Sequence, residues 1–414
     1  MRHTIAAASL LALAACGLNG TDRNKDDQPA EQNATAASGP GYATMASDNL
    51  ADSMGSRDGQ AATGEIADPE QRPVMQAQVV LDRLGFGPGV VDGKMGLSTV
   101  NAIEGFQESR GLPVTGKMDE ATKQALAQWQ AIPATRVVTI PAEWAQATYY
   151  ATPDKPENQA KMERLGYVSL DERLAERFHT TVETLKALNP GGRPAGAPAA
   201  TGAATSTPSP ISTPTPTPSA TGSDAPFTPQ PGPPSTFTAG QQIRVPNIGA
   251  DRIEPGKVDN AKWQQTLASL GVGTVQPEAA RIVVSKSENK LKAYDEAGKL
   301  IALFTVTSGS SRDPLPLGEW KILGEAYNPP FAYDPELFWD VADSEEKQQL
   351  PPGPNGPVGV VWIDLNKEHY GIHGTPEPQT IGRAQSHGCV RLTNWDAARL
   401  AQMVSASTEV EFVA

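Results

Sequence analysis

The sequence contains few cysteines and no run of basic residues. Cys16 and Cys389 are the only cysteines in 414 residues, and no two Lys or Arg residues are adjacent. The net charge at pH 7 is −13. A protein that binds nucleic acid or anionic lipid normally carries a basic stripe, so the sequence argues against both of these partners.

Large apolar residues are scarce in two long stretches. Residues 18–64 are mainly Ala, Gly, Ser, Asn and Asp, whereas residues 191–235 are mainly Pro, Thr, Ala and Gly. The whole chain holds 38 Gly and 37 Pro. Segments of this composition cannot bury enough apolar surface to order themselves. We therefore expect a disordered tether and a disordered insert, with two or three domains in the rest of the chain.

The first residues read as a targeting segment. A short positive start precedes the apolar run 5–15, which is too short to span a bilayer. The run ends in the letters LAACG, which include Cys16 and resemble the lipobox of bacterial lipoproteins. The resemblance implies a signal peptide over 1–15, lipidation of Cys16 and a tether over 16–65. An ordinary signal peptide with an accidental cysteine is the alternative.

Lipidation of Cys16 bears on the second cysteine. With Cys16 modified, Cys389 has no disulfide partner in an oxidising compartment, and a free exported thiol suggests reactivity. The residue after Cys16 is Gly17 rather than Asp, which favours the outer membrane if the host has two membranes. We expect a periplasmic, cell-wall-associated lipoprotein that contacts the membrane through its lipid anchor only.

The residues around Cys389 carry the groups needed for nucleophilic catalysis. Ser386-His387-Gly388-Cys389 follows His373-Gly374, and the Gly and Pro residues between them allow the chain to fold back. A thiolate can attack a carbonyl while an imidazole takes the thiol proton. Gly388 leaves backbone N–H groups open to a developing oxyanion.

Three other interpretations of these residues remain open. Cys389 could be a buried core cysteine, and it could instead bind zinc together with His373 and His387. One of the two histidines could be structural. The residues alone do not say which histidine would act as the base.

A His-Gly pair followed by Ser-His-Gly-Cys resembles the L,D-transpeptidase (YkuD-type) family of peptidoglycan-remodelling enzymes. The resemblance covers 281–414 and implies a mainly β catalytic domain. It implies that Cys389 is the nucleophile, that His373 is its base, and that the carbonyl of Gly374 orients His373. It also implies that carbapenems acylate the cysteine.

The same resemblance implies roles for the neighbouring residues. His387 and Gly388 would form the oxyanion pocket. Substrate contacts would come from Tyr370, Ser386 and Arg391. Many family members carry Asn two residues after the cysteine, where this chain has Arg391, and this departure leaves the acyl acceptor open. The resemblance implies neither a metal nor an organic cofactor.

Residues 66–130 contain an internal repeat. The turn Gly93-Lys94-Met95 recurs as Gly116-Lys117-Met118, each time before a short amphipathic helix, and Asp119 is placed to cap the second of these helices. A further helix is expected at about 76–84. The pattern resembles the small all-α, three-helix peptidoglycan-binding module. A generic helical spacer is the alternative.

Residues 165–248 predict a second module of the α+β kind. Two short helices end at Asn189-Pro190, and a strand at 239–246 follows the insert 191–235. This arrangement resembles an interrupted LysM glycan-binding module, although the typical Gly-Asp-Thr opening is missing. A helical connector is the alternative.

Within 281–414 the pattern is mostly strand, with a hairpin that turns at Glu288-Asn289. Further strands are expected at 300–307, 358–365 and 410–413. Asn394 is expected to cap a helix over 395–404. The segment 308–355 is rich in Pro, Gly and acidic residues, which predicts a long loop that shapes a cleft or lid.

Taken together, these resemblances imply a multidomain cysteine L,D-transpeptidase, an acyltransferase that acts on peptidoglycan, with the following two-step reaction. Cys389 would attack the carbonyl of the third, diamino-acid residue of a tetrapeptide stem and release D-alanine. An amine from a second stem or from a wall-attached protein would then resolve the thioester. If water resolved it, the protein would be an L,D-carboxypeptidase or an amidase. If the domain were inactive, the protein would be a non-catalytic wall-binding scaffold.

Overall fold

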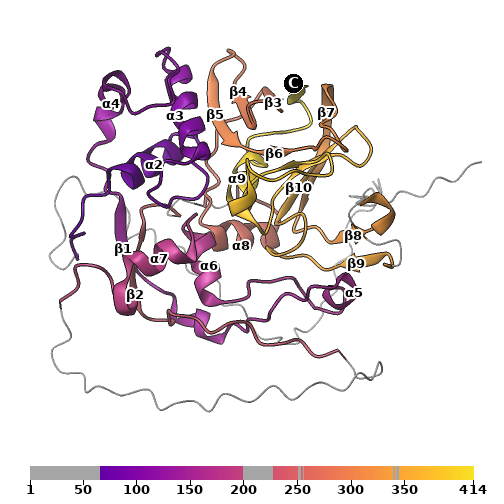
Figure 1. The fold of residues 1–414 in the computed structure, drawn as a ribbon, viewed down its shortest axis with the longest axis horizontal. Helices are drawn as coiled ribbons and strands as arrows, with labels where there is room; N and C mark the ends of the chain where they lie inside the picture. Colours follow the sequence, from indigo (N-terminus) through magenta and orange to yellow (C-terminus); the bar gives the residue numbers. More distant parts are fainter. Residues whose placement is uncertain (1–65, 199–226, 250–252, 255, 339–340, 342–344) are drawn as a thin grey trace, which may run out of the picture.

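The computed structural model describes residues 66–198, 227–249, 253–254, 256–338, 341 and 345–414 (Figure 1). The predicted signal peptide, the lipidation site Cys16 and the whole predicted tether 16–65 therefore lie outside the described residues. Among the helices within the described ranges, none is both long and apolar enough to cross a membrane.

The C-terminal part is built on a nine-stranded sheet in the order β5-β4-β3-β13-β7-β10-β11-β12-β6. Its strands are β3 Arg281–Ser285, β4 Lys290–Tyr294, β5 Leu300–Thr305, β6 Thr307–Ser308, β7 Gly318–Tyr327, β10 Val361–Leu365, β11 Gly371–His373, β12 Val390–Arg391 and β13 Glu409–Val413. β3 pairs with β13, and β11 with β12, in parallel, whereas the other neighbouring pairs are antiparallel. The predicted hairpin is confirmed, because β3 and β4 join through Asn289 at a positive φ of 53°.

One face of this sheet packs against two helices, α8 (Ala261–Leu270) and α9 (Asn394–Leu400). Alternate strand residues such as Ile363, Ile372 and Val390 are fully buried there. The indole Nε1 of Trp395 donates to the carbonyl of Leu270 at 2.8 Å, which fixes α9 to the end of α8. The opposite face of β10, β11 and β12 belongs to the candidate active site, which is described below.

The prediction of one long loop across 308–355 is wrong. This segment supplies β7, which lies between β13 and β10, and a separate hairpin of β8 (Phe331–Tyr333) and β9 (Gln348–Leu350). Pro and Gly flank β7, and most of its side chains are at least partly exposed, so the sequence shows no buried alternation there. Pairing with two neighbours overrides this weak local signal.

The predicted cap of α9 is also wrong by one residue. Thr393 is the N-cap, since its hydroxyl accepts from the N–H of Asp396 at 3.0 Å, and Asn394 is the first helical residue. The helix ends at Leu400 rather than at 404. Thr and Asn both cap helices, so their order alone did not decide the position. The side-chain amide of Asn394 makes hydrogen bonds to other segments of the chain.

The first described module consists of α2 (Pro73–Arg83), α3 (Leu97–Ser109) and α4 (Glu120–Leu126). Asp119 caps α4 as predicted, by accepting from the N–H of Thr122 at 2.9 Å. The sequence repeat has a structural basis. Gln78 accepts from the N–H of Gly93, and Gln107 accepts in the same way from the N–H of Gly116.

A two-stranded antiparallel sheet closes the second module, which we call the βααβ unit. β1 (Thr135–Thr139) pairs with β2 (Gln242–Pro246), and α6 (Leu170–Arg177) and α7 (Val182–Leu188) pack on them. The first strand lies upstream of the predicted start at 165. Sequence reasoning missed β1 because its partner strand lies about a hundred residues later in the chain. The likeness to LysM stays a prediction.

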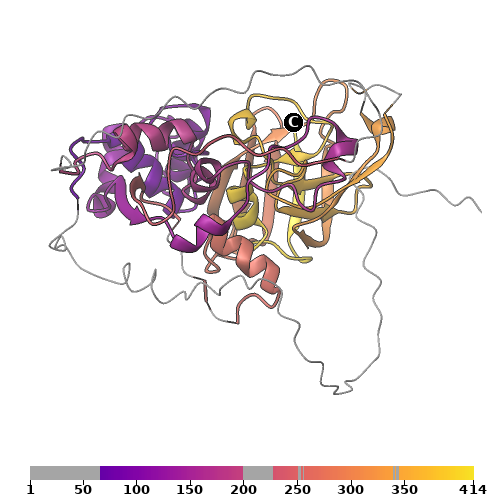
Figure 2. The same cartoon turned by 90° about the horizontal axis from the view of Figure 1, so that it is seen from below.

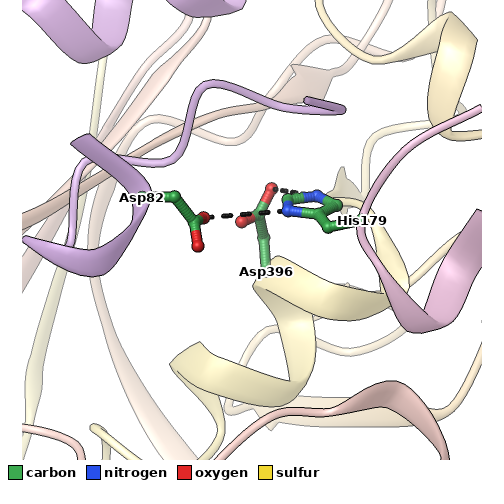
Figure 3. A group of neighbouring side chains, drawn as sticks. All are labelled: Asp82, His179 and Asp396. Carbon is green, nitrogen blue, oxygen red and sulfur yellow. Dashed lines mark ion pairs between the residues drawn. The ribbon is translucent and has the colours of Figure 1, made fainter. Parts of the chain in front are cut away.

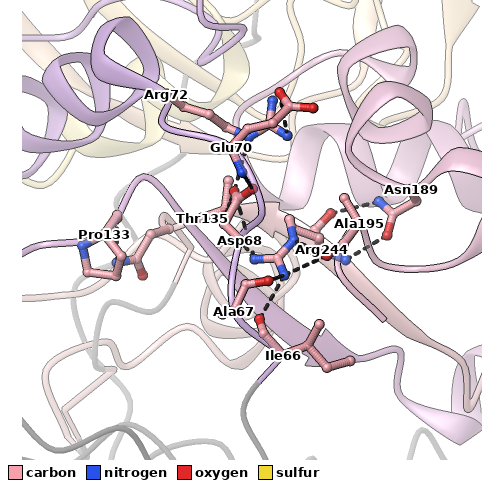
Figure 4. A network of polar contacts seen from close by, with 11 residues as sticks. Ile66, Ala67, Asp68, Glu70, Arg72, Pro133, Thr135, Asn189, Ala195 and Arg244 are labelled. Atoms are coloured by element: carbon pink, nitrogen blue, oxygen red, sulfur yellow. Dashed lines mark hydrogen bonds and ion pairs between the residues drawn. The ribbon is translucent and has the colours of Figure 1, made fainter. Parts of the chain in front are cut away.

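A buried arginine ties this unit to the start of the described chain (Figure 4). The guanidinium of Arg244 on β2 donates to the carbonyls of Ile66, Ala67 and Ala195. It also donates to the hydroxyl of Thr135 at 3.0 Å. The guanidinium of Arg244 donates in several directions, so this one side chain binds acceptors on separate segments of the chain.

The C-terminal end of the predicted insert 191–235 is hydrogen-bonded to the rest of the chain. The N–H of Gly232 donates to the carbonyl of Tyr149 at 3.0 Å, and the N–H of Leu170 donates to the hydroxyl of Ser235 at 3.0 Å. Residues 199–226 lie outside the described residues. The remaining helices are α5 (Pro156–Gln159) and the 3₁₀ turns η1 Ala127–Trp129, η2 Ala142–Gln146, η3 Pro190–Gly192, η4 Pro335–Leu337 and η5 Pro378–Thr380.

Both N-terminal modules pack against the catalytic sheet and its helices (Figures 1 and 2). Helix α3 lies along β5, where Asn101 Nδ2 donates to the hydroxyl of Thr305 at 3.0 Å. Lys290 on β4 pairs with Glu104 at 2.7 Å. Contacts of this kind hold the modules in a defined position beside the site.

Candidate active site

Two short parallel strands bring the predicted catalytic residues together. β11 and β12 pair with His373 opposite Arg391 and with Ile372 opposite Val390. Because side chains alternate between the faces of a sheet, Cys389 lies on the face of His373 and Arg391. Ile372 and Val390 point into the core on the other face. The register thus joins a thiol, an imidazole and a guanidinium on one face.

His373 is buried and held in one orientation. Its Nδ1 lies 2.7 Å from the carbonyl oxygen of Gly374. A carbonyl only accepts, so Nδ1 carries the proton, and in the neutral ring Nε2 keeps its lone pair. The ring also stacks on Trp362 of β10, with centroids 5.3 Å apart and planes at 21°. An imidazole in this state can take a proton at Nε2.

Cys389 is 6% exposed and ends a loop that is fixed by hydrogen bonds. Its Sγ donates to the carbonyl of His369 at 3.6 Å. Ser386 donates to the carbonyl of Cys389 at 2.6 Å and accepts from the N–H of Gly309 at 2.6 Å. Ser386 is buried and hydrogen-bonded to the backbone, and its expected contact with substrate stays a prediction.

Gly388 has no room for a side chain. Its φ is +101°, and a Cβ there would overlap the ring of Tyr370. Only glycine takes this conformation without strain. Tyr370 therefore lies against the turn that presents Cys389.

His387 and Arg391 flank the thiol on either side in the sequence. The ring of His387 packs edge-on against Phe338, with centroids 5.0 Å apart. Nε of Arg391 is buried without a hydrogen-bond partner among the described residues. A partly buried guanidinium with an unused donor is suited to an anionic ligand.

Trp362 belongs to this site, but sequence reasoning missed it. The indole forms part of a buried cluster that also contains Cys389, Met162, Leu165 and Phe331. Its alternation with Val361 and Ile363 on β10 was the signal available in the sequence. Met162 and Leu165 come from the βααβ unit, and no local pattern could have placed them beside Cys389.

A second group of titratable residues is buried where three units of the chain meet (Figure 3). His179 follows α6 and faces two carboxylates, with Nδ1 3.7 Å from Asp82 and Nε2 4.0 Å from Asp396. Burial acts to lower the pKa of His179, but the nearby carboxylates of Asp396 and Asp82 outweigh burial and raise it. Arg399 lies 3.4 Å from Asp82.

Asp82, His179 and Asp396 are the residues in the described part of the chain whose atoms could surround a metal ion. The ion pairs join the carboxylates to different ring nitrogens, whereas one ring nitrogen binds one ion. Arg399 already places positive charge beside Asp82. The arrangement suits an imidazolium between two carboxylates better than a metal. The group does not include His373, His387 or Cys389.

Comparison with known families identifies two domains in the chain. Residues 279–412 match the L,D-transpeptidase catalytic domain, YkuD, and residues 70–126 match the "Putative peptidoglycan binding domain". The chain is 33% identical over 146 residues to the Bacillus licheniformis protein named "Putative L,D-transpeptidase YkuD". That match covers 35% of this chain and 73% of that protein.

Other similar proteins are covered less fully. The chain is 28% identical over 137 residues to the Escherichia coli K12 protein named "Probable L,D-transpeptidase YbiS". That match covers 32% of this chain and 44% of that protein. A solved structure of L,D-transpeptidase 3 from Mycobacterium tuberculosis matches 32% of this chain and 60% of that chain, with 16% identity and a TM-score of 0.27. The chain belongs to the L,D-transpeptidase family, with a YkuD catalytic domain that follows an N-terminal peptidoglycan-binding domain.

Proposed function

We propose that the protein transfers acyl groups between peptidoglycan stem peptides through a thioester on Cys389. The observation that carries this proposal is the register of β11 and β12, which places Cys389 and His373 on one face with the His373 ring fixed by Gly374. A transpeptidase needs a nucleophile and a base that is held in the correct tautomer. In this proposal Cys389 is the nucleophile and His373 is the base.

In the first step His373 Nε2 takes the thiol proton and Sγ attacks the carbonyl of the third, diamino-acid residue of a tetrapeptide stem. Negative charge develops on the carbonyl oxygen. The bond to the terminal D-alanine then breaks, and the leaving amine takes the proton from the imidazolium of His373. A thioester remains on Cys389, and free D-alanine departs.

In the second step the amine of an acceptor attacks the thioester while His373 removes its proton. The thiolate of Cys389 leaves, and the new amide is the cross-link. The acceptor is a second stem or a wall-attached protein. The thiolate is the better nucleophile, so an imidazolium nearby favours reaction by lowering the pKa of the thiol.

Backbone and side-chain groups around the thiol would bind the charges of the substrate. The turn at Gly388 frees backbone N–H groups to donate to the oxyanion, and His387 shapes that side of the pocket. Arg391, with its unused buried Nε, would bind a carboxylate of the stem peptide. Tyr370 would line the same side of the site through its contact with the turn.

The rest of the chain would place this domain at the cell wall. Lipidation of Cys16 would anchor the protein in a membrane, and we favour the outer one. The module of α2, α3 and α4, which matches a peptidoglycan-binding domain, would hold glycan strands, and the βααβ unit would act as the LysM-like part.

The test is incubation of the purified protein with tetrapeptide-containing muropeptides, followed by separation of the products. Accumulation of cross-linked dimers together with free D-alanine supports acyl transfer to an amine. Shortened monomers without dimers would replace this proposal with a hydrolase. If a Cys389→Ala variant forms the same products, the thioester mechanism fails.

A further inference from the structure

A carboxylate of the βααβ unit contacts the catalytic domain close to its proposed base. Glu176, near the end of α6, accepts from the amide Nδ2 of Asn394 through Oε1 at 2.7 Å. Asn394 is 2% exposed and begins α9, five residues after Cys389. The same Nδ2 also donates to the carbonyl of Pro354 at 3.0 Å. Both amide hydrogens of Asn394 are therefore used.

The other end of the amide faces the backbone beside His373. Oδ1 of Asn394 accepts from the N–H of Val360 at 3.2 Å. A Cβ on Gly359 or on Gly374 would overlap this same oxygen. The amide of Asn394 thus fills the space that two glycines leave open. Gly374 is the residue whose carbonyl receives the Nδ1 hydrogen of His373 at 2.7 Å.

Only one orientation of the Asn394 amide satisfies these partners. If the amide flipped, its NH₂ group would face the N–H of Val360, donor against donor, and its oxygen would face two acceptors. A carboxylate accepts hydrogen bonds and donates none when ionised, so Glu176 selects the orientation that presents Oδ1 to Val360 and Gly374. Removal of Glu176 leaves that choice to the Pro354 carbonyl and the Val360 N–H.

We propose that Glu176 is a positioning residue for the transpeptidase reaction, acting through Asn394 on the Gly374 peptide that orients His373. This inference rests on the proposed roles of Cys389 and His373. It makes the βααβ unit part of the catalytic apparatus as well as a candidate wall-binding module. The route is short, because one side chain separates Glu176 from the Gly374 backbone.

Burying the carboxylate of Glu176 has an electrostatic cost. Burial raises the pKa of Glu176 to about 7, and the neighbouring carboxylate of Glu172 adds to the rise, whereas hydrogen bonds from Asn394 and Tyr167 oppose it. An apolar residue would avoid this cost. A protonated carboxyl still offers a carbonyl oxygen to Asn394, so the contact survives titration of Glu176.

Matched variants of the full chain test the proposal. Glu176→Met keeps the length of the side chain but removes the acceptor, Glu176→Gln keeps an acceptor, and Asn394→Ala removes the amide. Two readouts apply: the rate at which a carbapenem acylates Cys389, followed by intact mass, and the thiol pKa, taken from the pH dependence of iodoacetamide alkylation. Glu104→Gln, at an ion pair between α3 and β4, is the control for loss of an inter-module carboxylate.

We expect Glu176→Met to slow acylation about 10- to 100-fold, as a small displacement of a catalytic group does. The thiol pKa should move toward about 8.5. Glu176→Gln should restore most of the lost rate, and Glu104→Gln should react like the wild type. The double variant Glu176→Met/Asn394→Ala should be no slower than Asn394→Ala, because both changes act on one route.

Three results would overturn the proposal. In the first, folded Glu176→Met has the wild-type rate and thiol pKa. In the second, the loss in the double variant equals the product of the two single losses. In the third, Glu176→Gln is as slow as Glu176→Met. A wild-type protein that forms no adduct at all would instead contradict the proposed function, so the two failures are distinct.

Discussion

Nδ1 of His373 lies 2.7 Å from the carbonyl oxygen of its own neighbour, Gly374. This contact fixes the ring through the backbone, so no carboxylate is needed to set the tautomer. Oδ1 of Asn394 lies beside the backbone of Gly374, where a Cβ on this residue would overlap it. The orientation of the proposed base therefore depends on two glycines, one amide and a carboxylate from another module.

Gly388→Ala should impair the reactive turn more than an ordinary glycine substitution impairs its site. The new Cβ would sit at a φ of +101° and overlap the ring of Tyr370, and strain of this kind costs about 1–3 kcal/mol. We expect slower alkylation of Cys389 and a lower melting temperature. Gly298→Ala is the control, since Gly298 has a φ of +74° with no atom near its Cβ position. Equal effects of the two changes would show that Tyr370 does not constrain the turn.

Stability should depend on pH through Glu176. Its pKa is raised from 4.5 to about 7, chiefly by burial. A raised carboxyl pKa means that the folded state binds more protons than the unfolded state between these two values, so stability falls as the pH rises through this window. The full shift corresponds to about 3 kcal/mol. Urea unfolding of the wild type and of Glu176→Gln at pH 4.5 and pH 7.5 measures it.

The wild type should lose more stability than Glu176→Gln over that interval. A constant difference between the two proteins from pH 4.5 to pH 7.5 would contradict the raised pKa. Measuring the difference between two proteins removes the contributions of groups that titrate equally in both.

The fold of the catalytic sheet was predictable where local signals agree. The hairpin at Asn289 follows from a short turn pattern, as the cap at Asp119 of the first module follows from a capping pattern, whereas Trp362 beside Cys389 has no such signal. The strand β1 could not be predicted, because its pairing partner β2 is distant in sequence. β7 was not predicted for a different reason, because its partly exposed residues show no alternation of apolar and polar side chains.

The contacts between modules were the least predictable part of the site. Glu176 has no local feature that distinguishes it from a solvated helix carboxylate, yet it contacts Asn394. Asn394 looked like a helix cap because Asn often serves as one, and only the packed structure shows that Thr393 takes that role. Tertiary contacts decide such cases.

The predicted insert 191–235 should tolerate shortening up to residue 226, because Gly232 and Ser235 are hydrogen-bonded to other parts of the chain. Replacing 199–226 with a few Gly and Ser residues should leave the melting temperature nearly unchanged, because loop length costs only about 0.6 kcal/mol per doubling. Extending the replacement through 235 removes the hydrogen bonds of Gly232 and Ser235, each worth about 1 kcal/mol. Thermal unfolding distinguishes the two variants. A large loss from the shorter replacement would mean that 199–226 itself stabilises the protein.

Cys16→Ser should release the protein from the membrane. The lipobox resemblance implies a lipid on this thiol, so the variant should lose fatty-acid labelling and move from the membrane fraction to the soluble fraction. Unchanged membrane association would contradict the anchor. Labelling of Cys389→Ala should remain as in the wild type, which separates the two cysteines.

His373 and His387 should differ in their effect on the thiol. His373→Ala removes the proposed base, so the thiol pKa should rise toward about 8.5. His387→Asn should keep a lowered thiol pKa and lose rate through weaker oxyanion stabilisation, on the order of 10²–10³-fold. The reverse pattern would exchange the two roles. Iodoacetamide alkylation across pH gives both pKa values.

The most direct measurement is the intact mass of the wild type, Cys389→Ala, His373→Ala and His387→Asn during incubation with a carbapenem. The account predicts one covalent adduct on the wild type and none on Cys389→Ala. It also predicts adducts that form far more slowly on His373→Ala and moderately slowly on His387→Asn. An adduct on Cys389→Ala, or none on the folded wild type, would contradict a nucleophilic role for Cys389.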